Sequence, residues 1–278
     1  MSADRIDKNE AAKGLAFEFE KRLKKVEASS MHGQLPIIWD KAQDFFVFDP
    51  LGNKYIDFTS GIFIANAGHN NPQVKKALQE AMNGPISTYT YMNEARLSYL
   101  EFLIENTPSQ FEKAFLLSAG TEATEAALKL IKLYGMKKGY KKNIVLSFSG
   151  NWHGRTVGAQ VLSGNPQQRE WIDFSTENSI LHLPFPLPWK TEFNEESAYE
   201  AFNKHLDLLA QEHCFDPIKD VRGIVLETFQ GWGALFYPQS YIDAIKDFTK
   251  SSDTLVCFDE MQAGFGRTGK LFGYQHYD

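Results

Sequence analysis

Acidic residues end two apolar segments of this sequence that read as buried strands. The segment "GIVLE" ends at Glu227, and "TLVCF" is followed directly by Asp259 and Glu260. A carboxylate that terminates a buried strand is costly unless it is paired or faces a site. A solvated strand end explains one such case. Two cases favour a shared site, because ligands of parallel sheets gather at the carboxyl ends of the strands.

A turn of small residues opens another candidate element. Gly120 and Thr121 come shortly after the apolar segment "AFLLS" and begin the helical pattern "GTEATEAALKLIKLYG". A helix N-terminus offers unpaired backbone N–H groups and the positive end of the helix dipole, which suit a phosphate. An ordinary capped helix accounts for the pattern equally well. The absence of G-x-G-x-x-G at this point argues against a dinucleotide.

An aromatic residue and a histidine follow a further strand candidate. "NIVLSF" leads into "SGNWHGRT", which contains Trp152 and His153. The indole is either core packing or a flat surface for a planar ligand. A single loop histidine is more often structural than a ligand or a base. Together with the acids and the phosphate-type turn, these residues favour one pocket for a small molecule.

The glycines near the end of the sequence come close to a nucleotide-binding P-loop. Gly264, Gly269 and Lys270 have its spacing, but Leu271 stands where Ser or Thr must reach Mg²⁺. The first glycine is also separated from its strand by "DEMQA". We therefore reject a P-loop. No H-E-x-x-H, G-x-S-x-G or metal-spaced carboxylate set occurs, so we expect no metal site.

The alternation of apolar segments with helical patterns predicts the fold. Five short apolar runs alternate with helical patterns: "AFLLS", "NIVLSF", "SILHLP", "GIVLE" and "TLVCFDE". This pattern predicts an α/β fold with a mainly parallel sheet flanked by helices. Before it we expect a helix over about residues 9–28, a hairpin turning at "DPLGN", and a helix over 71–83 with Asn71 as its N-cap and Pro72 at its first position.

Composition excludes several classes of protein. The net charge is −6, with 29 basic and 35 acidic residues, which disfavours a nucleic-acid partner. No segment approaches the length of a membrane span, and the N-terminus is polar. The two cysteines, Cys214 and Cys257, are spaced for neither a metal nor an evident disulfide. We therefore expect a cytoplasmic protein with reduced thiols.

Taken together, these motifs resemble the class III (ω-type) aminotransferases, which are pyridoxal-phosphate enzymes of fold type I. The resemblance covers nearly the whole chain. It is carried by "DPLGNKYIDFTSGIFIANAGHNNP", "SAGTEATEAALKL", "GNWHGRT", "ETFQGWG" and "FDEMQAGFGRTGKLFG". Several ordered motifs at family-like spacing are a far stronger signal than any one of them.

The resemblance implies a role for each residue that binds the pyridoxal phosphate cofactor. Gly120 and Thr121 would bind its phosphate, and Trp152 would stack on the pyridine ring with His153 beside it. Asp259 would pair with the ring nitrogen and keep it protonated, so that the ring can accept electrons from the substrate. Asp259 is thus one of two residues assigned to catalysis.

The resemblance also implies the remaining contacts. Met261 would pack on the other face of the ring, and Gln262 would hydrogen-bond its hydroxyl. Glu227, the second catalytic assignment, would line the substrate side. Ile62, Trp152 and Trp232 would contact the substrate.

One departure from the family concerns the substrate. The family usually has an acid at the position of Trp232, and in 4-aminobutyrate- and ornithine-type enzymes that acid pairs with an arginine. Tryptophan cannot form this ion pair, so the ω-amino acid/2-oxoglutarate pairing is in doubt. A bulky wall would suit a smaller acceptor such as pyruvate, or a racemase-like reaction.

A second departure concerns the Schiff-base lysine that must hold the cofactor and move the proton. It would lie beyond the last residue given, because Lys270 belongs to the "GRTGK" loop rather than to the end of a following strand. We expect the sequence to be the N-terminal portion of a longer enzyme and inactive alone. Residues 1–65 would contribute to its small domain, and residues 66–278 would form most of its cofactor-binding large domain.

The expected function is transfer of an amino group between an amino acid or amine and a 2-oxo acid, in a homodimer. Two alternatives remain open at this point. One is a racemase, epimerase or decarboxylase that uses the same cofactor and fold. The other is a non-catalytic fragment or a partner subunit.

Overall fold

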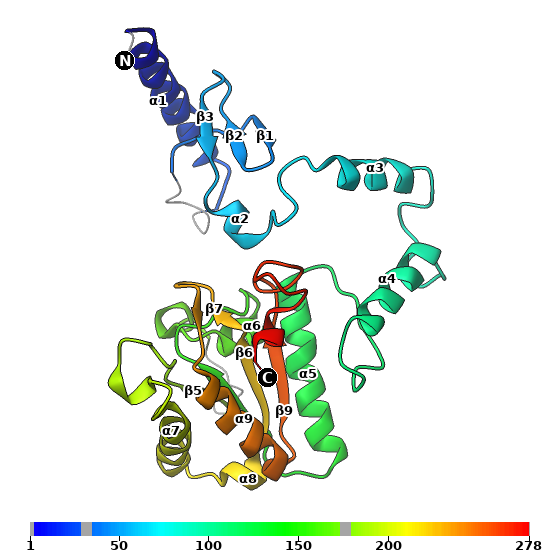
Figure 1. The fold of residues 1–278 in the computed structure, drawn as a ribbon, viewed down its shortest axis with the longest axis vertical. Coiled ribbons are helices and arrows are strands. Elements are labelled where there is room, and N and C mark those ends of the chain that lie inside the picture. The colour runs from blue at the N-terminus through cyan, green and yellow to red at the C-terminus, as the bar shows by residue number, and fades with distance from the viewer. Residues whose placement is uncertain (1–2, 29–34, 173–178, 278) are drawn as a thin grey trace. The chain divides into compact units, whose positions relative to one another are not determined.

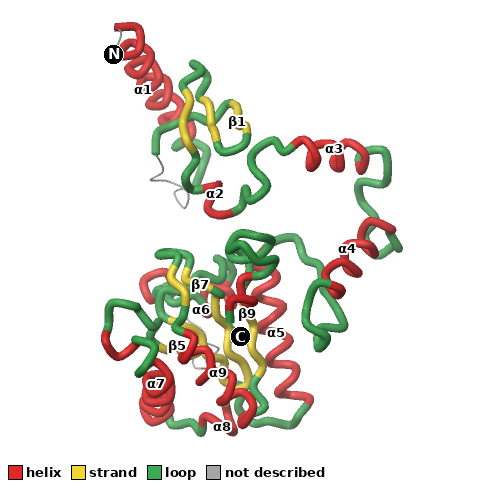
Figure 2. The backbone as a smooth tube through the Cα atoms, viewed as in Figure 1, coloured by secondary structure: helices red, strands yellow, loops and turns green. Residues whose placement is uncertain are grey.

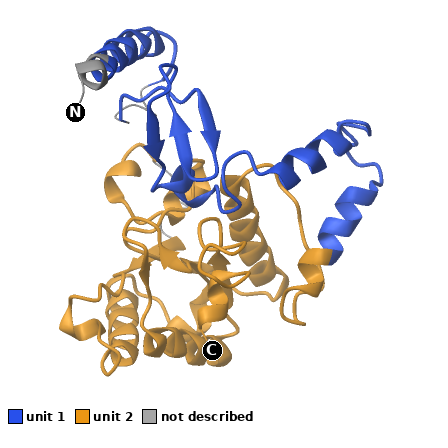
Figure 3. Ribbon diagram, turned by 45° about the horizontal axis from the view of Figure 1, so that its top comes forward, with its two compact units in different colours: residues 1–101 blue, residues 102–278 orange. Residues whose placement is uncertain are grey.

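The computed structural model describes residues 3–28, 35–172 and 179–277 of the chain. Two compact units divide it, residues 1–101 and 102–278 (Figure 3). The helix α4 (Glu94–Glu105) crosses this boundary. The assignment of residues 1–65 to the small domain of a whole enzyme stays a prediction.

Unit 1 contains a small antiparallel sheet and several helices. Its strands pair in the order β1-β2-β3, with Val47 buried in the central strand. The predicted hairpin is confirmed as β2 and β3, and the predicted first helix forms nearer the N-terminus than expected. The elements are α1 (Ala3–Leu23), β1 (Lys41–Gln43), β2 (Phe46–Phe48), β3 (Lys54–Ile56), α2 (Ser60–Phe63) and α3 (Pro72–Ala81).

The predicted hairpin turn and the predicted N-cap at Asn71 are both confirmed in unit 1, and the structure adds the role of Asp49. The Asp49 carboxylate accepts the backbone N–H groups of Leu51 at 3.0 Å and Asn53 at 2.8 Å, which closes the hairpin turn. The Asn71 side chain accepts the N–H groups of Gln73 and Val74 at the start of α3. Polar side chains that accept orphan backbone donors therefore fix both positions.

Unit 2 is built on a four-stranded parallel sheet with the order β5-β4-β6-β9 (Figures 1 and 2). The α/β fold class and four of the five predicted strands are confirmed. The sheet strands are β4 (Ile144–Phe148), β5 (Ile180–Leu183), β6 (Val221–Glu227) and β9 (Leu255–Asp259). A two-stranded hairpin, β7 (Phe229–Gln230) and β8 (Leu235–Phe236), follows β6.

The fifth predicted strand was wrong. Residues 114–118, "AFLLS", have no regular secondary structure, and Phe115 is 72% exposed. A strand needs a partner to satisfy its backbone groups, and none of the described strands pairs with this segment. β9 is an edge strand whose Leu255 and Val256 are only partly covered.

Helices cover both faces of this sheet (Figure 1). Because side chains alternate along a strand, Leu146 and Phe148 point to one face and Val145 to the other. The first face packs against α7 (Ala198–Glu212) and α9 (Gln239–Ser252), through residues such as Phe202 and Ile242. The second packs against α5 (Gly120–Lys137) and α6 (Val157–Leu162). Burial on both faces explains the continuous apolar runs.

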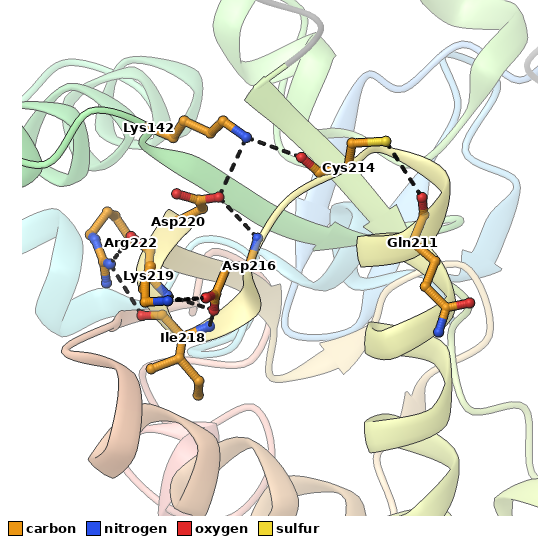
Figure 4. A network of polar contacts seen from close by, with 8 residues as sticks. All are labelled: Lys142, Gln211, Cys214, Asp216, Ile218, Lys219, Asp220 and Arg222. Carbon is orange, nitrogen blue, oxygen red and sulfur yellow. Dashed lines mark hydrogen bonds and ion pairs between the residues drawn. The ribbon is translucent and has the colours of Figure 1, made fainter.

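The chain enters β6 through a turn that polar contacts hold in place (Figure 4). It contains the short helix α8 (Pro217–Asp220). Lys142 lies between the carbonyl oxygen of Cys214, at 3.1 Å, and the carboxylate of Asp220, at 3.5 Å. Arg222 is fully buried and donates to the carbonyl oxygen of Ser252 at 2.5 Å. These contacts hold the start of β6 in place.

Candidate functional site

The carboxyl ends of three strands carry the polar residues singled out above. Glu227 at the end of β6 and Asp259 at the end of β9 are direct register partners. β4 leads through a short turn into Trp152 and His153. The structure thus brings residues from distant parts of the sequence to one edge of the sheet, as the topology of a parallel sheet requires.

Asp259 and His153 form a close pair. The Nδ1 atom of His153 lies 2.8 Å from Oδ2 of Asp259, with the imidazole fully buried and the carboxylate 16% exposed. The other oxygen, Oδ1, accepts the N–H of Met261 at 3.1 Å. The backbone N–H of His153 donates to the buried hydroxyl of Ser163 at 2.8 Å. Ser163 therefore holds the backbone of His153, and the imidazole orients the carboxylate through Nδ1.

Glu227 faces backbone amides. Its Oε2 accepts the N–H of Trp152 at 3.0 Å, and its Oε1 accepts the N–H of Gly231 at 3.3 Å. The side chain is buried, and burial raises the pKa of Glu227 from 4.5 to about 7, although the bond from Trp152 opposes this. Glu227 therefore ties together the two loops that carry Trp152 and Trp232. Its assignment to the substrate side stays a prediction.

Glu260, next to Asp259, has a structural role. Its carboxylate accepts the N–H groups of Gly273 and Tyr274, both at 2.7 Å, and the hydroxyl of Thr228. It thereby fixes the far end of the glycine-rich loop that resembles a P-loop. Glu260 lies just beyond β9, which ends at Asp259, so its role is shown by its hydrogen-bond partners and not by the alternation of the strand.

The phosphate-type turn begins α5. Ala119 is the N-cap residue, and its methyl side chain cannot accept a hydrogen bond from the first backbone N–H groups of the helix. A methyl group on Gly120 would overlap the terminal Cε of Met261. The turn therefore approaches the residues after β9 closely, and only glycine leaves this space open.

Met261 and Gln262 follow Asp259 on the same loop. Met261 is 59% exposed beside Gly120. The Oε1 atom of Gln262 is buried beside Gly231, where it has no hydrogen-bond partner within the described parts of the chain. An unpaired buried amide oxygen costs free energy, so this group is available to a ligand.

Two tryptophans from different loops are in contact beside these residues. The rings of Trp152 and Trp232 are edge to face, with centroids 6.5 Å apart and an interplanar angle of 78°. The guanidinium of Arg155 lies over Trp152, 5.3 Å from the ring centroid. Trp232 is 72% exposed. The indole of Trp152 is thus held edge-on by Trp232 while its loop is anchored by Glu227.

Ile62 belongs to unit 1. It lies in α2 with φ of 59°, and its side chain is 63% exposed. Residues 60–63 all have positive φ, an unusual left-handed turn for side chains other than glycine. Its expected contact with the substrate stays a prediction.

The fold and the candidate site define a class of protein: an α/β domain whose candidate site residues lie at the carboxyl edge of a parallel sheet. The fold is that of known aminotransferases. A Bacillus anthracis aminotransferase superposes with a TM-score of 0.81 at 24% identity, over 100% of this chain and 60% of that one. The taurine:2-oxoglutarate aminotransferase of Bifidobacterium kashiwanohense, solved with PLP and glutamate, gives a TM-score of 0.78 at 23% identity, over 95% and 59% of the two chains.

The chain belongs to the class-III aminotransferase family, whose profile matches residues 28–278. It is 31% identical over 251 residues to an acetylornithine aminotransferase of Clostridium acetobutylicum, covering 89% of this chain and 58% of that protein. It is 34% identical over 264 residues to the ornithine aminotransferase of Saccharomyces cerevisiae, covering 91% and 57%. The chain spans little more than half the length of these curated relatives.

Two further findings concern the described residues. None of their helices has both the length and the apolar character needed to cross a membrane. They also contain no group of three or more His, Cys, Asp or Glu side chains that could hold a metal ion. Cys214 and Cys257 are free thiols.

Proposed function

We propose that the protein to which this chain belongs is a pyridoxal-phosphate-dependent aminotransferase that exchanges an amino group between an amino acid or amine and a 2-oxo acid. The observation that carries the proposal is the contact between the buried imidazole of His153 and the partly exposed carboxylate of Asp259 at the end of β9. Family membership supports the same reaction. When bound, the cofactor supplies a ring that withdraws electrons from the substrate carbon.

The residues of the site fit this group. Asp259 has lone pairs left after its bonds to His153 and Met261, and an anionic carboxylate there holds a proton on a pyridine nitrogen. The open amides at the start of α5 suit a phosphate. Trp152 offers its indole for stacking, and the unpaired amide of Gln262 suits the ring hydroxyl.

Trp232 supports a small or apolar acceptor over a dicarboxylate. Its side chain carries no charge, so it cannot pair with an arginine, and its ring is in an edge-to-face contact with Trp152. With the whole protein, we expect pyruvate to be a better acceptor than 2-oxoglutarate, and W232E to narrow that preference. A whole protein that prefers 2-oxoglutarate would refute this assignment.

The cellular setting is proposed on narrower grounds. Two free thiols, one of them exposed, support a reducing compartment such as the cytoplasm. A homodimer is supported by the family resemblance alone. Light scattering of the whole protein would test the dimer.

The binding test uses the chain itself. Pyridoxamine 5′-phosphate is the probe, because its amine cannot react with surface lysines, and calorimetry measures its affinity. We expect binding, and a loss of about tenfold or more in Asp259→Asn, because a charge-assisted hydrogen bond is removed. Asp207→Asn, at an exposed position on α7, is the matched control. Failure of the wild-type chain to bind, or equal binding by Asp259→Asn, would contradict the proposal.

A further inference from the structure

Glu125 connects two parts of the site that the sequence leaves separate. It lies four residues after Thr121 on α5, and therefore on the same face of that helix. Its Oε1 atom accepts three hydrogen bonds from the start of α6: from the hydroxyl of Thr156 at 2.5 Å, and from the N–H groups of Gly158 at 2.8 Å and Ala159 at 3.1 Å.

This carboxylate replaces the usual cap of α6. Thr156 is the N-cap residue of that helix, but its side chain does not cap it. The first amides bond instead to a carboxylate from another helix, which the positive end of the helix stabilises. The approach requires Gly158, because a Cβ at that position would overlap the Glu125 carboxylate.

The contact continues to the phosphate-type turn. The Oγ1 atoms of Thr121 and Thr156 lie 2.9 Å apart. Thr156 has one hydroxyl proton, which it gives to Glu125, so Thr121 must be the donor to Thr156. Gly154, with φ of 134°, lets the loop pass directly over Thr121, where any Cβ would overlap the threonine side chain.

The loop from Trp152 to Thr156 is therefore fastened to the first turn of α5 through Glu125 and Thr121. We propose that Glu125 is a positioning residue, which holds the ring-stacking Trp152 at a fixed separation from the amides that bind the phosphate. This inference rests on the proposed function. Glu125 touches neither ring nor phosphate itself; it acts by keeping the two half-sites in register.

The structure makes a sharp prediction about two variants. Glu125→Ala removes all three bonds, whereas Glu125→Gln keeps the oxygen that accepts them. The ring-stacking Trp152 and the phosphate-binding amides strengthen each other's binding of one ligand only when the distance between them matches the ligand. We therefore expect Glu125→Ala to weaken pyridoxamine 5′-phosphate by at least about tenfold, while inorganic phosphate and pyridoxamine, tested singly, change by less than about threefold. Glu125→Gln should stay within about threefold of wild type for all three ligands.

The controls separate positioning from a general loss of structure. Glu212→Ala, at an exposed position on α7, should change nothing. Hydrogen exchange of residues 152–162 should quicken in Glu125→Ala only. Equal behaviour of the two Glu125 variants, or parallel weakening of all three ligands, would overturn the inference. A wild-type chain that binds no pyridoxamine 5′-phosphate would overturn the proposed function and with it this role, whereas binding that Glu125→Ala leaves intact would overturn this role alone.

Discussion

Glu227 should make the stability of this chain fall as the pH rises. Its side chain is 4% exposed, and burial raises its pKa from 4.5 to about 7. The folded state therefore binds the proton more tightly than the unfolded state does. The stabilisation is fully present below pH 4.5 and is lost as the pH rises through about 7.

The size of the effect follows from the two pKa values. Their separation corresponds to about 3 kcal/mol of unfolding free energy, of which about 2.5 kcal/mol is lost between pH 5 and pH 8. Glu227→Gln cannot ionise and should not share this loss. Relative to wild type, the variant should therefore gain about 2.5 kcal/mol across this range.

Urea unfolding followed by circular dichroism, at several pH values, would measure this difference. Subtracting wild type from variant cancels the contributions of groups that do not interact with Glu227. Glu212→Gln, at an exposed position, should give a flat difference. A flat difference for Glu227→Gln as well would show that this carboxyl titrates normally, and would refute the inference that burial controls it.

Two other predictions test the framework around the site. Gly164→Ala should destabilise the chain by at least about 3 kcal/mol, because its methyl group would overlap backbone atoms of β4 and the following turn. Gly120→Ala should lower the free energy of unfolding by under about 1 kcal/mol, because only the flexible tip of Met261 must move, yet it should impair phosphate binding. Chemical unfolding measures the stability of both glycine variants, and calorimetry measures their phosphate binding. Equal destabilisation by the two substitutions would contradict this reasoning. Burial, and then Arg169, lower the pKa of His182 from 6.5 to about 4, so stability should fall as the pH drops between these values. His182→Gln should remove about 3 kcal/mol of that fall, and an unchanged acid profile would count against it.

The sequence was sufficient to predict the sheet and the edge at which the candidate site residues gather. Continuous apolar runs identify β4, β5 and β6, which helices bury on both faces, and the edge strand β9, which is only partly covered. The rule that ligands gather at the carboxyl ends then points to Trp152, Glu227 and Asp259. The same reasoning failed for "AFLLS", since an apolar run says that a segment is suited to burial but not which strand it pairs with.

The connections within the site could not be predicted. The pairing of His153 with Asp259 depends on the path of a loop between β4 and α6, which no periodicity encodes. The carboxylate of Glu227 points toward the backbone amides of Trp152 and Gly231, so its orientation depends on the paths of the two loops that contain them. Glu125 bonds to a helix more than 30 residues away in sequence, and only the three-dimensional arrangement shows that contact.

The edge of β9 has a consequence for how this chain behaves in solution. Its outer row of N–H and C=O groups has no strand partner among the described residues, and the apolar "AFLLS" segment is likewise unpaired. Such an edge accepts any extended apolar segment. A segment of the same polypeptide and a segment of a neighbouring copy therefore compete for the same hydrogen bonds. Pairing within one polypeptide is independent of concentration, whereas pairing between two copies is not. Dilution therefore shifts the balance from self-association toward pairing within one polypeptide.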